Sequence, residues 1–315
     1  MTGATGFLGG HLCRRLRDLG HVVLCLGRDL EKGAVLAAEG MAFEAIDLTG
    51  SGLALRWGQA DMLIHAAALS SAWGTRTDFE HANVTGTQNA IDIAQRLNAA
   101  RLVFISSPSV GFQYRDQLNV READSLPPPV NAYAATKHIA EGLVRRSGLD
   151  TIILRPRGIY GKGDTALLPR LIRAAKSRRL PLLRKGAAVT DLTHVDDVVS
   201  AIVQSTEAPP SCAGRTYNIS SGEALPVHRI ITAACQAAGV SARFQPMPVS
   251  LALTAARLAE CTAGLLPGRP EPTITAYGVG ILAFSQTLDL SAAQRDLGYC
   301  PQVDLAEGLR RTFGS

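Results

Sequence analysis

The sequence is poor in aromatic residues and has no long uninterrupted hydrophobic run. Only 5% of its 315 residues are Phe, Trp or Tyr, and a net charge of +5 is spread over scattered basic residues. A nucleic-acid surface would need a longer basic stripe with aromatics interleaved. No uncharged apolar stretch reaches the roughly 18–20 residues of a membrane span. We therefore expect neither a nucleic-acid partner nor a membrane span.

The longest apolar segment, 248–268, is interrupted by Arg257 and Glu260. We expect it to form an amphipathic helix that packs on its own domain. Contact with a substrate pocket or with a membrane surface are the alternatives.

Patterns typical of metal sites and disulfides are also missing. The six cysteines lie far apart, with no C-x-x-C pair and no Cys/His cluster at metal-ligand spacing. The first residues lack the charged start and apolar run of a signal peptide. We expect reduced thiols, a cytoplasmic location and no metal, with a disulfide set as the alternative for the cysteines.

Short apolar runs alternate with helical stretches along the first half of the chain. Nearly continuous apolar runs are typical of strands buried on both faces, and such runs are found at 21–27, 41–48, 61–68, 101–107 and 150–156. Later in the chain, 215–220 is also expected to be a strand. Helices are expected between them, notably over 78–97 and 131–146. This alternation predicts a Rossmann-type, doubly wound parallel α/β sheet.

The pattern loosens beyond Gly161, where helices are expected over 167–178 and within 190–205. We expect a nucleotide-binding domain over 1–165 and a smaller substrate-binding lobe over 166–315. Residues from about 190 to 220 are expected to return to the first domain.

A glycine-rich turn opens the chain. In "TGATGFLGG" the glycines stand at Gly3, Gly6 and Gly9, directly before a helical stretch. The spacing differs from G-x-G-x-x-G, but the mechanics are the same: glycines allow close backbone approach, and the helix N-terminus attracts a pyrophosphate. Glycine turns also end strands for structural reasons alone, and the helix that follows favours the dinucleotide site.

The end of the next strand bears on which dinucleotide binds. An acidic residue about 20 positions past the glycines suits the ribose of NAD, and an arginine suits the phosphate of NADP. Here Arg28 is followed by Asp29. We predict NADP as the cofactor, with NAD as the alternative. Arg28 could also be an ordinary solvent-exposed arginine with no role in binding. Asp47, which ends the third strand, is expected either to bind adenine or to cap the next turn.

Tyr133 and Lys137 stand four residues apart, on one face of the helix expected after Asn131. A neighbouring ammonium favours a phenolate and lowers the pKa of tyrosine, so the pair suits proton exchange with a carbonyl or alcohol oxygen. Ser106 and Ser107 end a strand, where ligands of open α/β sheets bind. A serine there is more often only a turn residue.

Together these motifs resemble the extended short-chain dehydrogenase/reductase superfamily, which includes the NAD-dependent epimerases and dehydratases, over nearly the whole chain. The matching stretches are "TGATGFLG", "HAAA", "NVTGT", "SSPSV", Tyr133-x-x-x-Lys137, "LRPRGIYGKGD" and "HVDDV". Within the superfamily, "HAAALSSAWG", "SSPSVGF" and "TLDLSAAQRDLGYCPQV" are most similar to the 3β-hydroxysteroid dehydrogenase-like branch. That branch includes bacterial reductases of 2-alkyl-3-oxoalkanoates.

The resemblance implies a role for each matching residue. Tyr133 would donate and accept the proton, Lys137 would tune it and bind the nicotinamide ribose, and Ser107 rather than Ser106 would hold the substrate oxygen. Asn83 would support the helix geometry, and His194 would pack or cap. The expected cofactor-binding residues are Gly3, Thr5, Gly6, Phe7, Leu8, Arg28, Asp47, Leu48, Ala66, Ala67, Tyr133 and Lys137.

Two departures from the sugar-nucleotide enzymes of the superfamily concern the substrate. Thr190 stands where those enzymes carry a phosphate-gripping arginine, and Gly158 stands where they tend to have asparagine. Both favour an apolar ketone or alcohol, such as a 3-oxoacyl or steroid-like compound. The alternatives are a nucleotide-sugar epimerase or dehydratase with bound NAD, and a non-catalytic dinucleotide sensor. Relatives dimerise through the helices matching 78–97 and 131–146, and we expect a homodimer.

A third departure concerns the first strand. Relatives carry several apolar residues before the glycines, whereas only Met1 and Thr2 precede them here. We expect this central strand to be missing. Each buried side chain lost with it would cost roughly 1.5–3 kcal/mol. That is a large loss for a protein whose net stability is about 5–15 kcal/mol. Our hypothesis is that Met1 is not the native start. A shortened, unstable protein is the alternative.

Overall fold

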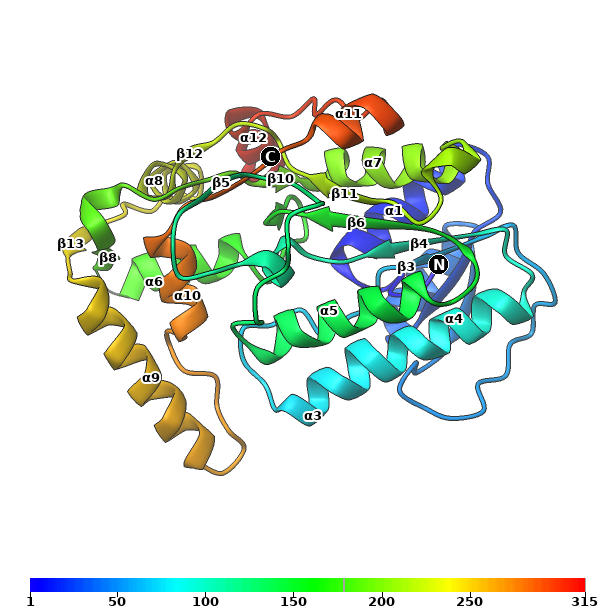
Figure 1. The fold of residues 1–315 in the computed structure, drawn as a ribbon, viewed down its shortest axis with the longest axis horizontal. Helices are drawn as coiled ribbons and strands as arrows, with labels where there is room; N and C mark the ends of the chain where they lie inside the picture. The colour runs from blue at the N-terminus through cyan, green and yellow to red at the C-terminus, as the bar shows by residue number, and fades with distance from the viewer. Residues whose placement is uncertain (178, 315) are drawn as a thin grey trace.

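The computed structural model describes residues 1–177 and 179–314 and is built around a parallel sheet (Figure 1). One part of the sheet pairs β1 with β2, and the other has the order β11-β6-β4-β3. The strands are β1 (Leu24–Gly27), β2 (Ala42–Ala45), β3 (Met62–His65), β4 (Arg101–Ile105), β6 (Asp150–Pro156) and β11 (Thr216–Ile219). The predicted Rossmann-type sheet is thereby confirmed.

The first residues of the chain join the two parts of the sheet. Thr2 forms parallel bridges to Leu26 of β1 and to His65 of β3. Its amide donates to the Ile64 carbonyl at 3.0 Å, and the Met1 carbonyl accepts from the Leu26 amide at 2.8 Å. Within the described residues no longer strand fills this central position, so only a short ladder of hydrogen bonds holds β1 beside β3.

Two pairs of helices cover the two faces of the sheet (Figure 1). On one face α1 (Phe7–Asp18) packs beside α7 (Val195–Glu207), burying Leu12 and Val198. On the other face α4 (Gly86–Arg96) lies along α5 (Ala132–Arg145), burying Ile93 and Ala140. The apolar positions of each helix recur every three to four residues, so one stripe faces the sheet. At the edge, α2 (Leu30–Ala38) lies against β2.

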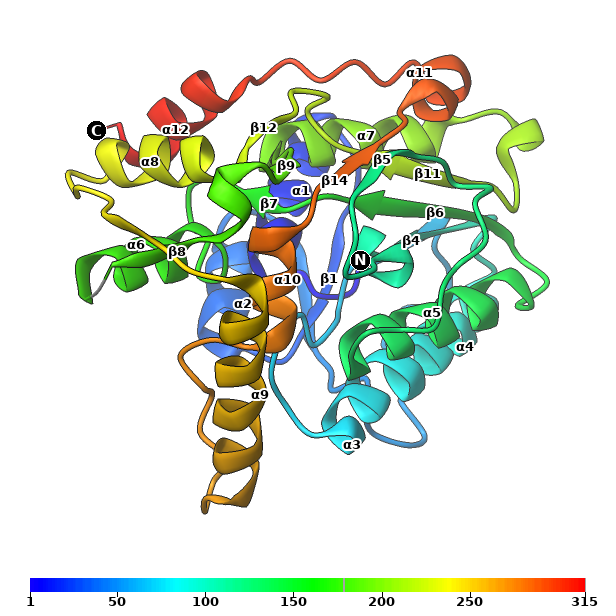
Figure 2. The same ribbon diagram turned by 60° about the vertical axis from the view of Figure 1, so that its left-hand side comes forward.

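A second lobe is assembled from later parts of the chain (Figure 2). A small sheet has the order β12-β9-β14-β5, and β8 pairs with β13. Its strands are β5 (Gln117–Val120), β8 (Leu180–Leu182), β9 (Val189–Thr190), β12 (Leu225–Pro226), β13 (Phe244–Pro246) and β14 (Gln286–Leu288). Its helices are α6 (Leu168–Ser177), α8 (Val227–Ala237), α9 (Val249–Leu265), α10 (Ala276–Ala283) and α12 (Leu305–Phe313). Helix α11 (Ser291–Leu297) packs instead on β11 and α7 of the main domain. The predicted boundary at 165/166 stays a prediction.

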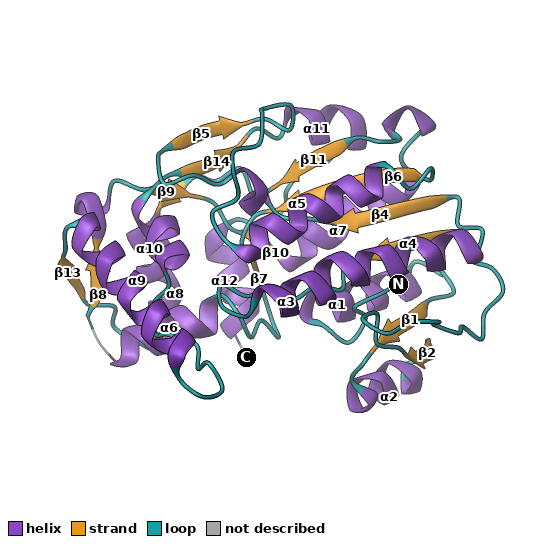
Figure 3. Cartoon of the chain, turned by 60° about the horizontal axis from the view of Figure 1, so that its bottom comes forward, coloured by secondary structure: helices purple, strands orange, loops and turns teal. Residues whose placement is uncertain are grey.

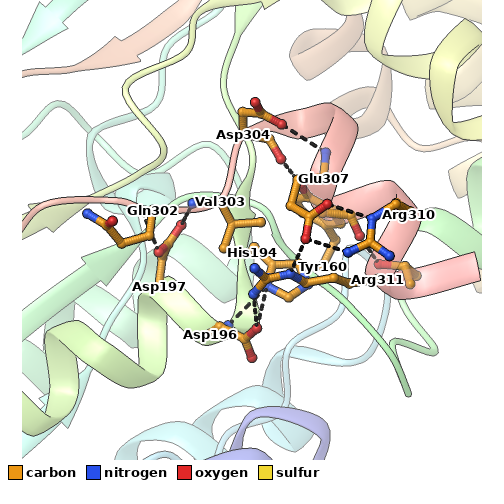
Figure 4. Close-up of polar contacts among 12 residues, drawn as sticks. Tyr160, His194, Asp196, Asp197, Gln302, Val303, Asp304, Glu307, Arg310 and Arg311 are labelled. Carbon is orange, nitrogen blue, oxygen red and sulfur yellow. Dashed lines mark hydrogen bonds and ion pairs between the residues drawn. The ribbon is translucent and has the colours of Figure 1, made fainter. Parts of the chain in front are cut away.

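The segment between the two sheets returns to the main domain. A short pair, β7 (Ile159–Tyr160) with β10 (Thr193–His194), leads into α7. His194 caps α7, because its Nδ1 accepts from the Asp196 amide at 3.3 Å, as predicted. Figure 4 shows that Asp196 also pairs with Arg311 of α12, so the last helix is fastened to the start of α7.

The predicted helices agree with the structure to within a few residues, and Arg178, at the end of one of them, lies outside the described residues. The helix predicted over 78–97 begins earlier, as α3 (Arg76–Phe79), and contains a π-helical turn, Glu80–Thr85, before α4. Strands β5 and β14 were not predicted, because each is short and has too few apolar residues to stand out. Figure 3 shows them side by side above the lobe helices.

The apolar segment 248–268 forms α9, which packs on α10 through Ala252 and Ala256. Packing on its own lobe is therefore confirmed. Its other face carries Leu251 and Leu258, both exposed. None of the helices described in residues 1–177 and 179–314 combines the length and apolar character that a membrane crossing requires.

Candidate active site

A cavity of about 500 Å³ lies where the glycine turn, the ends of β4 and β6, and the second lobe meet. Carboxyl ends of parallel strands form the usual ligand crevice of such sheets. The structure brings together eight of the predicted residues in the wall of this cavity: Gly3, Gly6, Phe7, Leu8, Ala66, Ser107, Tyr133 and Lys137.

The glycine turn fits a pyrophosphate by its packing. Gly3 has φ of +71°, and a Cβ there would lie 2.7 Å from the Ala67 amide nitrogen. A Cβ on Gly9 would lie 2.7 Å from the Gly3 carbonyl carbon. At Gly6, the N-cap of α1, no side chain caps the helix and its first turn has no acidic residue. The first amides of a helix lack intrahelical partners, so this end offers donors and a positive dipole to an anion.

Five of the predicted cofactor residues lie outside the cavity wall: Thr5, Arg28, Asp47, Leu48 and Ala67. The Thr5 side chain packs against Gly27, and the Ala67 amide donates to Thr2 Oγ1 at 3.4 Å. Leu48 is buried in the core between the sheet and α4.

Asp47 caps a turn by accepting from the Thr49 amide and hydroxyl, each at 2.9 Å. These bonds, with a smaller contribution from Arg28, lower the pKa of Asp47. Of the two expectations for Asp47, the structure contains the turn cap.

Helix α5 presents Tyr133 and Lys137 to the cavity. Asn131 caps the helix by accepting from the Ala134 amide at 2.8 Å, as expected of an N-cap asparagine. Burial raises the pKa of Tyr133, and hydrogen bonds with Ser70 and Ser107 oppose that shift. The phenol therefore stays protonated at neutral pH and has a hydroxyl on either side as hydrogen-bond partner.

The Lys137 ammonium is bonded to the backbone rather than to Tyr133. Its Nζ donates to the Ile105 carbonyl at 2.6 Å and lies 4.2 Å from the centre of the Phe104 ring. Burial lowers the pKa of Lys137 to about 7, with Glu141 opposing the shift. The predicted lowering of the Tyr133 pKa by this ammonium is wrong for this structure, because desolvation of the phenol dominates.

The buried amine makes stability depend on pH. Below pH 7 Lys137 is charged in both the folded and the unfolded chain, so the whole cost of burying the charge is present. Between pH 7 and its ordinary value of 10.5 the unfolded chain binds the extra proton, so this contribution to stability rises with pH. We therefore expect the free energy of unfolding of Lys137→Met, relative to that of the wild type, to be higher at pH 7 than at pH 9.5. The difference should change by up to about 1.4 kcal/mol per pH unit.

Urea unfolding of wild type and Lys137→Met at both pH values measures this difference. An equal difference at pH 7 and pH 9.5 would show that the amine keeps its proton in the fold.

The neighbouring residues Ser106 and Ser107 have different hydrogen-bond partners. Ser106 Oγ donates to Glu141 Oε1 at 2.6 Å, and Glu141 is fully buried in a bidentate pair with Arg155 at 2.7–2.8 Å. Ser107 Oγ lies in the cavity wall, accepts from the Ser109 amide at 3.2 Å and bonds with Tyr133. Of these two serines, Ser107 is the one whose hydroxyl lies beside the phenol, and its role at the substrate oxygen stays a prediction.

Asn83 joins a loop to the active-site helix. Its Oδ1 accepts from the Leu69 amide at 2.8 Å, and its Nδ2 donates to Thr136 Oγ1 of α5 at 3.0 Å. Asn83 lies in the π-helical turn, a feature frequent at functional sites. The support expected from Asn83 therefore takes the form of a clamp between the loop that carries Ser70 and the helix that carries Tyr133.

Sequence reasoning gave no role to several polar residues of the cavity wall, among them Ser70, Arg157 and Tyr277. Burial raises the pKa of Tyr277 to about 12. Ser70 and Arg157 lie within the matching stretches "HAAALSSAWG" and "LRPRGIYGKGD", but no spacing marks them as site residues, and Tyr277 lies in no such stretch. The "RPRG" stretch was the only available signal for Arg157.

The far end of the cavity is apolar. It is lined by Leu171, Leu192, Val227, Ile230, Ile231, Ile281 and Leu282. Gly158 has φ of +47°, and a Cβ there would lie 2.7 Å from Leu192 Cδ2. Any side chain at this position would push Leu192 from its place, so glycine keeps this wall apolar.

Comparison with known proteins places the chain among enzymes. The pattern of the family described as "NAD dependent epimerase/dehydratase family" matches residues 1–220. The 2-alkyl-3-oxoalkanoate reductase of Stenotrophomonas maltophilia is 35% identical over 100% of this chain and 98% of its own. The 4-hydroxy-2-methyl-3-oxo-4-farnesyl-3,4-dihydroquinoline-1-oxide ketoreductase of Stigmatella aurantiaca is 33% identical over 98% and 93%. A decarboxylating sterol-4-alpha-carboxylate 3-dehydrogenase of Saccharomyces cerevisiae is 28% identical over 99% and 95%.

Solved structures share the fold. UDP-glucuronic acid 4-epimerase from Bacillus cereus, solved with UDP-glucuronic acid and NAD, superposes with a TM-score of 0.75 at 22% identity, over 99% of this chain and 96% of that one. UDP-glucose 4-epimerase from Thermotoga maritima gives a TM-score of 0.75 at 20% identity, with the same coverage.

Proposed function

We infer that this chain, which belongs to the NAD-dependent epimerase/dehydratase family and to the 3β-hydroxysteroid dehydrogenase-like branch of the extended short-chain dehydrogenases/reductases, is an oxidoreductase of apolar ketones and secondary alcohols. The observation that carries this proposal is the cavity itself. It joins the glycine turn, the pair Ser107 and Tyr133, and an apolar far end.

The residues of the chain divide the chemistry among them. A bound nicotinamide dinucleotide supplies or accepts the hydride at the carbonyl carbon. Tyr133 donates its phenolic proton to the carbonyl oxygen during reduction and takes it back during oxidation. Ser107 donates a hydrogen bond to the same oxygen, and Lys137 binds the nicotinamide ribose. Gly3, Gly6, Phe7 and Leu8 hold the pyrophosphate with their backbone, and Ala66 lies beside it.

NADP is the proposed cofactor. Arg28 is exposed, and within residues 1–177 and 179–314 its side chain has no hydrogen bond or ion pair, so it is available to a phosphate. Asp29 is already engaged: it caps α2 by accepting from the Lys32 amide at 3.0 Å and pairs with the Lys32 ammonium at 3.2 Å. Thr5, Asp47, Leu48 and Ala67 support the turns around this dinucleotide.

Replacing Arg28 by alanine is expected to lower the preference for NADPH over NADH by about 10- to 100-fold, because a charge-assisted contact to the phosphate is lost. The ratio of kcat/KM for the two cofactors measures it. Arg15→Ala, which removes an exposed arginine from α1, is the matched control and should keep the ratio. A preference for NADH in the wild type would favour NAD instead.

The names of two relatives describe the proposed substrate class. A 3-oxoalkanoate and a sterol carrying a 4-carboxylate beside its 3-position each place a carboxylate two carbons from the reacting centre. We propose a 3-oxo or 3-hydroxy compound with a long apolar body.

The proposal is tested by following NADPH oxidation with 3-oxoacids, steroid ketones and simple aldehydes. A nucleotide-sugar epimerase would instead retain NAD tightly and show a thermal shift with UDP- or dTDP-sugars. A non-catalytic sensor would bind dinucleotide and turn over none of these compounds. Either outcome would overturn the proposed reaction.

Three further properties belong to the same proposal: a homodimer, a cytoplasmic location and a substrate lobe beginning at residue 166. The outer faces of α4 and α5 support the dimer, because no helix or strand within residues 1–177 and 179–314 lies over them (Figure 1). The Cys25 thiol donates a hydrogen bond to Cys13 Sγ at 3.5 Å, and a pair of free thiols suits a reducing compartment. Analytical ultracentrifugation measures the assembly.

A further inference from the structure

Arg157 is a buried arginine in the wall of the cavity. Only 8% of its surface is exposed, although it follows directly on β6 and faces the site. Its Nε and Nη2 donate to Thr190 Oγ1 at 3.1 and 2.8 Å, and its Nη1 donates to Gln286 Oε1. A guanidinium carries five N–H groups in a planar fork. Three are used in these bonds, and one on each terminal nitrogen is left.

The charge of Arg157 lacks the partner that comparable residues have. Arg101 and Arg155 are also buried, and they pair with Asp150 and Glu141 at 2.7 Å. Among the residues that the structure describes, no carboxylate forms an ion pair with Arg157. Buried charges are normally paired, because desolvation of a lone charge is costly.

Arg157 influences the pKa of one buried carboxyl group, that of Asp191, and this group has a hydrogen-bond partner of its own. Asp191 Oδ2 accepts from Ser220 Oγ at 2.6 Å, and burial raises the pKa of Asp191 while Arg157 opposes that shift. The two side chains therefore interact at a distance without a hydrogen bond. The protein's own bonds to Arg157 come from neutral groups, Thr190 and Gln286, which orient the fork without neutralising it.

Arg157 lines the same cavity as Tyr133, the proposed proton donor. Tyr277 lies close enough to both Arg157 and Tyr133 for each of them to influence its pKa. All three side chains line the same cavity.

We propose that Arg157 is the carboxylate-binding residue of this site and that the substrate is a 3-oxo or 3-hydroxy carboxylic acid. The proposal rests on the proposed oxidoreductase function and adds a specificity-determining residue to it. The two free N–H groups bind the carboxylate, Ser107 and Tyr133 bind the oxygen two carbons away, and the apolar chain fills the far end. A neutral ester or ketone leaves the buried cation unpaired.

The experiment compares a stable acid with its methyl ester in the oxidation direction. With NADP⁺ as co-substrate, we expect the wild type to oxidise 3-hydroxydecanoate with a kcat/KM about 10- to 100-fold above that for methyl 3-hydroxydecanoate, mostly through KM. Arg157→Gln should bring this ratio close to one, and Arg157→Lys should restore part of it. Calorimetry with the acid should show the same loss of affinity.

Arg170→Gln is the matched control. Arg170 also borders the cavity, but it is exposed and already paired with Glu271 at 2.9 Å, so the acid-to-ester ratio should be kept. A ratio lost in Arg170→Gln and kept in Arg157→Gln would overturn the assignment.

The other outcomes are separable. Equal kcat/KM for acid and ester in the wild type overturns the carboxylate role while the oxidoreductase function stands. Turnover of neither compound, nor of any ketone or alcohol in the panel above, overturns the function itself. Arg157→Gln loses bonds to Thr190 and Gln286, so its folding is checked by thermal unfolding. Should it fail to fold, the wild-type ratio and Arg157→Lys decide.

Discussion

Replacing Tyr133 by phenylalanine is expected to lower kcat by about 10²- to 10⁴-fold, the range that a positioned general acid contributes. The phenol has the hydroxyls of Ser70 and Ser107 as hydrogen-bond partners, and burial raises its pKa, so it stays protonated at neutral pH. Phenylalanine removes only the oxygen, so the ring still packs near Phe79, with 6.3 Å between ring centres. Cofactor affinity is expected to stay within about twofold, measured by fluorescence titration with NADPH.

Tyr277→Phe is the control, because it removes the other phenol of the cavity wall. We expect it to reduce kcat by less than about tenfold. Unchanged turnover in Tyr133→Phe, or an equal loss in both variants, would remove Tyr133 from the proton-transfer step.

Replacing Gly9 by alanine is expected to destabilise the protein by about 3 kcal/mol and to abolish dinucleotide binding. The added Cβ would lie 2.7 Å from the Gly3 carbonyl carbon and 2.9 Å from Ala4 Cα, and closer still to the Gly3 carbonyl oxygen. These are backbone atoms of the phosphate-binding turn, which has no flexible side chain to yield. Overpacking of this kind costs about 1–3 kcal/mol or more. Thermal unfolding and NADPH titration measure the two effects.

Gly10→Ala provides a neighbouring comparison on the same helix. Its Cβ would meet the end of the Arg14 side chain at 3.2 Å, a flexible group that can move. Since alanine also has the higher helix propensity, this variant should be as stable as the wild type or slightly more so. Equal stability of the two alanine variants would show that α1 can shift away from the turn.

The strands and helices of the main sheet could be predicted because they carry repeated local signals. Runs such as "RLVFI" are apolar throughout, as a strand buried on both faces requires, and the stripe containing Leu12 and Leu16 recurs at helical spacing. The residues of the glycine turn and the Tyr133/Lys137 pair were found for the same reason, since each belongs to a short motif.

What the sequence did not reveal depends on contacts between distant segments. The orientation of the Lys137 ammonium is set by the Ile105 carbonyl and Phe104, 32 and more positions away. Gln286, which holds Arg157, is 129 residues from it along the chain. The hypothesis that Met1 is not the native start stays a prediction. The central strand was expected to be missing altogether, but Thr2 takes part of its place by bridging to β1 and β3.

The Asn83 clamp has a consequence for how precisely the site is assembled. One amide group holds both the Leu69 backbone, next to Ser70, and Thr136, three residues after Tyr133. Thermal drift of the loop relative to the helix is therefore limited by the stiffness of a single side chain. The Ser70 hydroxyl and the Tyr133 phenol are therefore aligned before substrate binds, so little rearrangement of the phenol is needed when charge develops on the substrate oxygen.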